Sequence, residues 1–156
     1  MFTTSLPIRY DECDPYGHVN HANYLHYMQE AAFRASAAAG YSVERYAEMD
    51  RVWYVRETDI EYLAPLRYGS DVEIETGVLD FRRVRSRRAY TLRQAENGTT
   101  AARAVTDWVF LDLNRQRPAS VPEELVDAFL PDGPPAGVPP REPFPDAPPP
   151  PPGVFR

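Results

Sequence analysis

The chain lacks several features that would define its class at once. Its 156 residues contain no lysine, so all 17 basic residues are arginine, and the formal net charge of −6 disfavours general nucleic-acid binding. The single cysteine, Cys13, excludes an internal disulfide. No run of 18 apolar residues and no apolar signal-peptide segment is present, so no membrane span is expected. Together these absences predict a cytoplasmic protein.

Proline is abundant, but it is concentrated at one end of the chain. Residues 131–153 read PDGPPAGVPPREPFPDAPPPPPG. Such a segment supplies neither a helix interior nor the backbone donors of a sheet, and it holds few core residues. We therefore expect one folded domain over residues 1–130 and a proline-rich, disordered or polyproline-II tail over residues 131–156. The tail could be an inert extension or a ligand for a proline-recognition domain.

The remaining sequence predicts one long helix among strands. The alanine-rich run 22–39 has a helical composition and carries its apolar residues on one stripe, and Gly40 is a good helix stop. The order of one strand, a long helix and four strands indicates an α+β protein in which an antiparallel sheet of about five strands packs on one central helix. Alternation and turn signals predict strands at 5–11, 52–63, 71–78, 84–94 and 100–113, and short helices at 43–49 and 121–129.

Residues 13–24, CDPYGHVNHANY, lie between the first predicted strand and the long helix. The segment from Asp14 to Gly17 fits a type I turn, which would lift the Asp14 carboxylate out of the strand. Asn20 is suited to be the N-cap of the helix. The backbone N–H groups of the first helical turn, near His21, then lack intrahelical partners and carry the positive end of the helix dipole.

An acid held beside such N–H donors suits acyl transfer. A carbonyl oxygen could accept a hydrogen bond from a helix-start N–H as it becomes an oxyanion. The Asp14 carboxylate could attack the carbonyl carbon or deprotonate a water molecule. The same residues also allow a purely structural role, in which Asp14 anchors its own turn and Asn20 caps the helix. Spacing alone leaves both roles open.

Residues 8–25, IRYDECDPYGHVNHANYL, resemble the active-site signature of hotdog-fold thioesterases. The closest groups are the 4-hydroxybenzoyl-CoA thioesterase family and the acyl-CoA thioesterases associated with the Tol-Pal system. Residues 60–70, IEYLAPLRYGS, resemble the strand and turn after the helix in that family, and the likeness covers about residues 5–115. It implies a hotdog fold, thioester hydrolysis without a metal or redox cofactor, and at least a dimer with its sites at the subunit interface.

The resemblance also implies roles for individual residues. It places the catalytic carboxylate at Asp14, lines the site with Tyr10 and His21, and puts the oxyanion donor at or beside the His21 N–H. The stretch Gly-His-Val-Asn, where some family members have Gly-Val-Val-Tyr, is expected to contact the substrate. The residues concerned are Gly17, His18 and Asn20.

Three other readings of nearby residues are weaker. His21 and His26 point to different sides of a helix, and the histidine spacing matches no zinc signature, so no metal site is predicted. Cys13 adjoins the acid of the turn on an extended chain and should face the other way, which favours an incidental thiol. Glu30 lies too deep in the helix for a helix-start site and is placed to pair with Arg34.

The basic stretch FRRVRSRRAY, residues 81–90, offers a second candidate site. Arginine binds phosphate well, so Arg82, Arg83 and Arg85 could hold the phosphates of coenzyme A. Alternatively, they belong to a solvent-facing strand that pairs with the acidic residues of 71–75.

These observations predict an acyl-CoA thioesterase that releases a free acid and CoA and assembles as a homodimer or homotetramer. Two alternatives remain open. One is an acyl-carrier-protein thioesterase of fatty-acid or polyketide metabolism, which uses the same chemistry on a different carrier. The other is a non-catalytic hotdog module that binds an acyl group or a protein partner.

Deletion of residues 131–156 tests the reading of the tail. If the tail is inert, the shortened chain keeps the thioesterase activity and the oligomer size of the full chain. The measurements are thiol release from acyl-CoA and light scattering after size-exclusion chromatography. Loss of either property would show that the tail contributes to the site or to assembly.

Overall fold

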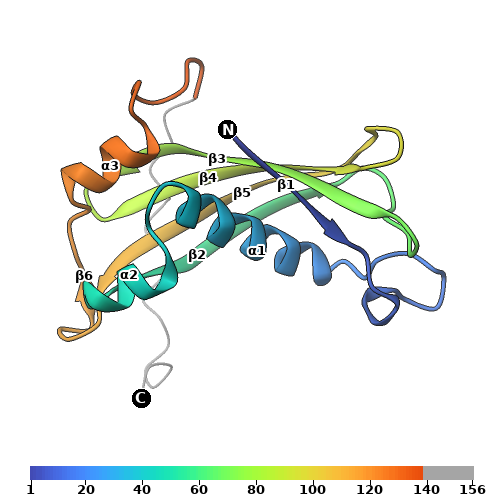
Figure 1. The fold of residues 1–156 in the computed structure, drawn as a ribbon, viewed down its shortest axis with the longest axis horizontal. Coiled ribbons are helices and arrows are strands. Elements are labelled where there is room, and N and C mark those ends of the chain that lie inside the picture. Colours follow the sequence, from blue (N-terminus) through green and yellow to red (C-terminus); the bar gives the residue numbers. More distant parts are fainter. Residues whose placement is uncertain (139–156) are drawn as a thin grey trace, which may run out of the picture.

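The computed structural model describes residues 1–138 of the chain. Its sheet and its main helix form two layers (Figure 1). The elements are β1 (Phe2–Pro7), a 3-10 turn (Tyr10–Glu12), α1 (Asn23–Ala38), α2 (Val43–Glu48), β2 (Arg51–Tyr62), β3 (Asp71–Arg82), β4 (Arg85–Gln94), β5 (Thr100–Asp112), β6 (Arg117–Pro118) and α3 (Glu123–Phe129).

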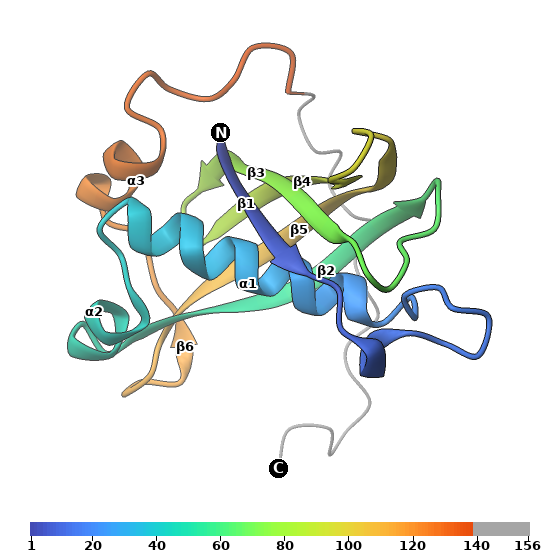
Figure 2. The same ribbon diagram turned by 45° about the vertical axis from the view of Figure 1, so that its right-hand side comes forward.

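One antiparallel sheet curves around α1, as the turned view in Figure 2 shows. The strand order is β1-β3-β4-β5-β2, and the short β6 pairs with β5. The predicted α+β class, with five main strands and one long helix, is confirmed. β2 pairs with β5 alone, so its other edge is open within the described part of the chain.

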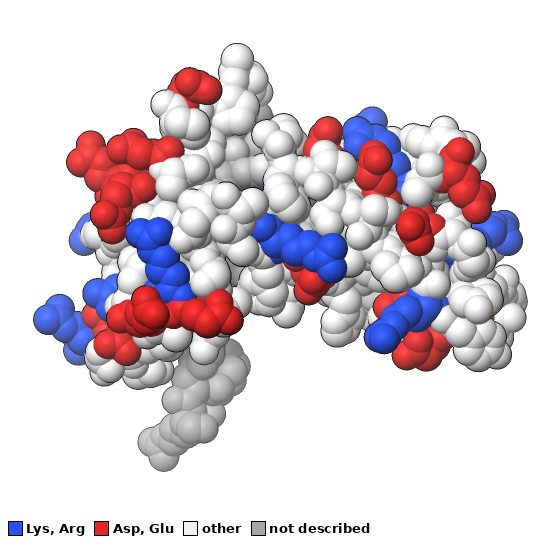
Figure 3. Space-filling model, viewed as in Figure 1, with Lys and Arg blue, Asp and Glu red and all other residues white. Residues whose placement is uncertain are grey.

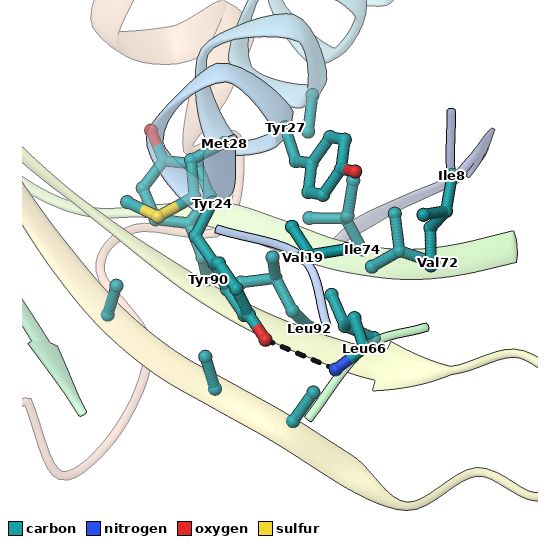
Figure 4. Close-up of a cluster of buried hydrophobic side chains, with 14 of the residues drawn as sticks. Ile8, Val19, Tyr24, Tyr27, Met28, Leu66, Val72, Ile74, Tyr90 and Leu92 are labelled. Carbon is teal, nitrogen blue, oxygen red and sulfur yellow. Dashed lines mark hydrogen bonds between the residues drawn. The ribbon is translucent and has the colours of Figure 1, made fainter. Parts of the chain in front are cut away.

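The buried face of α1 explains how closely the helix approaches the sheet. Its buried residues recur at a spacing of three or four, and Ala31, which is fully buried, is small enough to let the backbone approach. The facing strands contribute alternate residues, because successive side chains of a strand point to opposite sides. Tyr24 also accepts a hydrogen bond from the Leu66 N–H at 3.3 Å (Figure 4). The cluster includes Ile8, Val19, Tyr24, Tyr27, Met28, Leu66, Val72, Ile74, Tyr90 and Leu92.

Several predicted boundaries were wrong. The strand predicted at 71–78 continues to Arg82, and the first strand begins at Phe2 and not at Ser5. The first strand ends at Pro7, and a 3-10 turn follows because the Glu12 carboxylate accepts from the Arg9 N–H at 2.8 Å. Asn20 is not the N-cap of α1, since that position is Ala22; the Asn20 side chain instead closes the preceding turn by accepting from the Ala22 N–H at 3.0 Å.

The surface carries charges of both signs. On the face drawn in Figure 3, blue and red atoms are interspersed, and acidic residues gather over α3 at the left. Among the described helices, none is long and apolar enough to cross a membrane. Residues 131–138 contain turns without a helix or strand, and the rest of the predicted tail, 139–156, lies outside the described residues.

Candidate active site

Glu12 fixes the loop of residues 12–20 to the start of α1. Its carbonyl oxygen accepts from the Asn20 N–H at 2.8 Å and from the Asn23 side-chain amide at 2.9 Å. Its carboxylate accepts from the buried Tyr27 hydroxyl at 2.6 Å. Burial and this hydrogen bond raise the pKa of Tyr27 well above its ordinary value, so the hydroxyl stays a donor. The loop cannot leave the helix without breaking these contacts.

Asp14 lies on the tight turn at the tip of this loop. The Asp14 N–H donates to the His18 carbonyl at 2.7 Å, and the Asp14 carbonyl accepts from the Gly17 N–H at 3.0 Å. Gly17 has a φ of 75°, which glycine adopts without strain. The predicted turn is therefore confirmed.

The two oxygens of the Asp14 carboxylate differ in their hydrogen bonds. Oδ1 accepts from the Tyr16 N–H at 2.9 Å and from the His18 N–H at 3.2 Å, so the side chain does anchor its own turn. Oδ2 has no hydrogen-bond partner within residues 1–138. The two backbone donors fix the orientation of the carboxylate and leave one oxygen available for a reactant.

The start of α1 presents N–H donors nearby. The Ala22 and Asn23 N–H groups both donate to Asn20, whereas those of His21 and Tyr24 have no acceptor in the described chain. Asp14 follows Glu12 by two residues, which limits their separation to roughly 7 Å. An acid and two available donors thus belong to one anchored unit of structure.

The side chains of Tyr10 and His21 lie on the outside of the described chain. Tyr10 is 79% exposed and contacts Tyr68 edge to face, with ring centroids 5.7 Å apart. His21 is exposed and contacts Tyr62 in the same way at 6.5 Å, while the Tyr62 hydroxyl donates to the His21 carbonyl at 3.1 Å. Among the described residues, no hydrogen bond or ring contact joins either side chain to Asp14.

Two cavities lie between α1 and the sheet. The larger has a volume of about 650 Å³ and a mostly apolar lining from α1, α2 and the inner face of the sheet. The smaller, of about 210 Å³, includes Leu25 and Met28 from the first turns of α1. Gln29, Val55 and Trp108 line both cavities, so the two cavities adjoin each other beside α1.

The arginine stretch lies at the other end of the strands from Asp14. Pro7, which precedes the loop of residues 12–20, pairs with Asp71 at the start of β3. Arg82 lies at the opposite end of that strand (Figure 1). Within this chain, therefore, Arg82, Arg83 and Arg85 do not share a site with Asp14.

Most of these arginines have acidic partners. Arg85 forms a short ion pair with Asp107, and Arg82 lies 3.5 Å from Asp80. Arg83 is exposed, and its carbonyl accepts from the Val121 N–H at 2.7 Å. The acids of 71–75 pair elsewhere, since Glu73 and Glu75 face Arg93.

The remaining candidates occupy structural positions. The Cys13 thiol lies 3.7 Å from the Arg9 carbonyl and packs against the core. The predicted pairing of Glu30 with Arg34 is confirmed at 2.8 Å. Residues 1–138 contain no group of three or more His, Cys, Asp or Glu side chains placed to hold a metal ion.

A curved antiparallel sheet around one helix, with an acidic loop at the helix start, defines a hotdog protein of the thioesterase type. The sequence model of the thioesterase-like superfamily matches residues 8–129. The chain belongs to this superfamily, which confirms the predicted fold. The narrower likeness to the 4-hydroxybenzoyl-CoA or Tol-Pal-associated groups stays a prediction.

Individual relatives are distant. Oleoyl-acyl carrier protein thioesterase 1 from the chloroplast of Arabidopsis thaliana is 26% identical over 109 residues, covering 66% of this chain and 30% of that protein. The match thus spans less than a third of that relative. A thioesterase from Thermus thermophilus, solved with coenzyme A and Zn, is 27% identical with a TM-score of 0.71, covering 82% of this chain and 90% of that one. A 1,4-dihydroxy-2-naphthoyl-CoA thioesterase from Synechocystis, 22% identical with a TM-score of 0.75 over 82% and 94% of the two chains, shares the fold.

Replacement of Tyr27 by Phe tests the attachment of the loop to α1. The variant loses a buried hydrogen bond to a carboxylate, so its free energy of unfolding should fall by about 1 to 3 kcal/mol. Urea denaturation measures the change. Tyr16→Phe is the matched control, because Tyr16 is 84% exposed and the loss of its hydroxyl should change the free energy of unfolding by no more than about 0.5 kcal/mol. Equal stability of the two variants would show that the Tyr27 contact does not hold the loop.

Proposed function

We propose that the protein hydrolyses an acyl-CoA thioester to a free acid and CoA. The observation that carries this proposal is the state of Asp14, whose Oδ1 is fixed by two backbone donors while Oδ2 has no partner in the described chain. Two further observations support it. The N–H groups of His21 and Tyr24 have no acceptor in the described chain, and two adjoining cavities lie beside α1. Membership of the thioesterase-like superfamily supports it independently.

In the proposed reaction the thioester carbonyl lies at the start of α1. Its oxygen accepts from the His21 N–H, with Tyr24 as a second donor, and this stabilises the negative charge that develops there. Asp14 Oδ2 removes a proton from water, whose oxygen then bonds to the carbonyl carbon. The C–S bond breaks next, and the protonated Asp14 returns the proton to the sulfur, which leaves as a thiol. Direct attack by Oδ2, giving a mixed anhydride that water then hydrolyses, uses the same geometry.

The other residues of the loop would hold the substrate. Tyr10 and the His21 side chain position the substrate or water in this proposal. Gly17, His18 and Asn20 shape the wall of the site beside the acid. Tyr10, Gly17, Asn20 and His21 are exposed and His18 is half-buried in one chain, which is consistent with a site that a second chain completes.

We infer a homodimer, or a homotetramer built from it, from the open edge of β2. That strand is 12 residues long and exposes Tyr54, Val55 and Tyr62 by 58%, 49% and 46%. A long exposed edge with apolar side chains favours pairing with another copy. Arg82, Arg83 and Arg85 could bind CoA phosphates only if a second copy of the chain brought them close to the loop of residues 12–20 of the first copy.

An acyl-carrier-protein thioesterase is the second candidate. The curated relatives are named oleoyl-acyl carrier protein thioesterases, which favours this carrier. The T. thermophilus relative solved with coenzyme A favours CoA. The chemistry at Asp14 is the same for both, so a comparison of hydrolysis rates on matched acyl-CoA and acyl-carrier-protein substrates separates them.

Replacement of Asp14 by Asn should lower turnover by at least about 10²-fold, the scale expected for removal of a general base. Asn keeps the shape of the side chain and an oxygen for the turn, so the fold should remain. Thiol release is measured over a panel of acyl-CoA and acyl-carrier-protein substrates. Asp11→Asn is the control, because Asp11 is an exposed acid of the neighbouring 3-10 turn and should be dispensable. Unchanged turnover by Asp14→Asn would favour the non-catalytic acyl-binding module.

A further inference from the structure

Arg88 is a buried cation in the wall of the larger, mostly apolar cavity. Its side chain lies on the inner face of β4, where the buried positions alternate as Ser86, Arg88, Tyr90 and Leu92. Arg88 is only 6% exposed and lines the cavity of about 650 Å³. Its Nη1 donates to the Thr76 hydroxyl at 3.4 Å, and its guanidinium lies 5.7 Å from the centre of the Phe129 ring. Both partners are neutral.

No carboxylate of residues 1–138 pairs with Arg88, and none lines the cavity. The other arginine of the cavity wall, Arg51, has an acid partner, since it lies 3.2 Å from Asp112. Asp107 is also buried, but it pairs with Arg85, whose side chain points to the other face of β4. Burial lowers the pKa of Arg88, yet a guanidinium stays charged in proteins. A buried charge without a counter-charge is costly, which calls for an anion from outside the chain.

Ser86 supplies a second donor beside Arg88. It lies two residues earlier on the same face of β4, lines the same cavity and is 5% exposed. Its hydroxyl makes no hydrogen bond among the described residues, and it is not one of the fully buried atoms, so it keeps some accessible surface. The other polar groups nearby are satisfied, because the Trp53 N–H donates to the Tyr46 hydroxyl at 3.1 Å and the Trp108 N–H donates to Thr106 at 2.6 Å.

We propose that this cavity binds an acyl group whose far end carries a carboxylate, which accepts hydrogen bonds from Arg88 and Ser86. The inference deepens the proposed function, on which it rests, by making thioesters of dicarboxylic acids the preferred substrate class. A guanidinium presents paired donors that match the two oxygens of a carboxylate. The apolar walls between the two ends fit the methylene chain.

The dimensions agree with a chain of medium length. Ala32 lines the same cavity as Arg88 and lies nine residues beyond Asn23, so it is about 13 Å along the helix from the proposed position of the thioester. The smaller cavity, lined by Leu25, Met28 and Tyr90, occupies the interval.

Matched CoA substrates with and without a terminal carboxylate test the proposal. The pairs are octanoyl-CoA with octanedioyl-CoA, decanoyl-CoA with decanedioyl-CoA, and dodecanoyl-CoA with dodecanedioyl-CoA. The wild type should prefer the dicarboxylic member of at least one pair in kcat/KM by about tenfold or more, the scale of a hydrogen bond to a charged group. Arg88→Met, which keeps the volume and removes the charge, should abolish this preference and retain activity on the monocarboxylic member.

Binding of non-hydrolysable thioethers makes the test independent of turnover. S-(7-carboxyheptyl)-CoA should bind the wild type at least about tenfold more tightly than S-octyl-CoA in calorimetry, and Arg88→Met should bind the two equally. The difference should appear even if the protein hydrolyses no thioester, so a failure of the proposed function does not hide the result. Arg103→Met, which removes an exposed arginine of β5, is the control and should keep the preference.

Three outcomes would overturn the proposal. One is equal binding of the two thioethers by the wild type together with no preference for any dicarboxylic substrate. Another is a parallel loss for both members of a pair in Arg88→Met, which would place a CoA phosphate, or no anion, at Arg88. The third is a lower melting temperature of Arg88→Met with its preference intact, because that would assign the guanidinium to the fold; the proposal expects an unchanged or higher melting temperature.

Discussion

The attachment of Glu12 to α1 is the constraint on which the proposed site depends. One residue joins the loop to the helix twice, through its carbonyl to Asn20 and Asn23 and through its carboxylate to the buried Tyr27 hydroxyl. These contacts anchor the base of the loop that carries Asp14 to the start of α1, where the N–H groups of His21 and Tyr24 lie. Preorganised donors of this kind act on developing charge without the cost of reorientation. The backbone N–H groups of Tyr16 and His18 orient the Asp14 carboxylate.

Charge is distributed unequally over the two faces of the sheet. On the outer face, Arg85 pairs with Asp107 and Arg87 with Asp80, so basic residues there are neutralised by neighbouring strands. On the inner face, Arg88 meets only neutral groups within residues 1–138. The helix α1 connects the proposed active site with the Arg88 cavity. Its start is bonded to the loop of residues 12–20, and its middle lines the cavity that Arg88 also lines.

Local sequence signals predicted the helices and strands well, but not the buried position of Arg88 in the larger cavity. The turn from Asp14 to Gly17 and the helix that follows depend on neighbouring residues, so spacing and composition were sufficient. The 3-10 turn was missed because it depends on the reach of the Glu12 side chain. The N-cap lies two residues after Asn20, because Asn20 closes a turn of its own by accepting from the Ala22 and Asn23 N–H groups. Arg88 could have been found, since it alternates with Tyr90 and Leu92. Its missing counter-ion could not, because that requires knowing which strands face it.

The most direct measurement of the central idea is a crystal structure with an acyl-CoA ketone analogue, in which a methylene group separates the carbonyl from the sulfur. The account predicts that the ketone oxygen lies within hydrogen-bond distance of the His21 or Tyr24 N–H and that the Asp14 carboxylate faces the carbonyl carbon. A ketone bound with its carbonyl away from the first turn of α1, with Asp14 in contact only with its own turn, would contradict it.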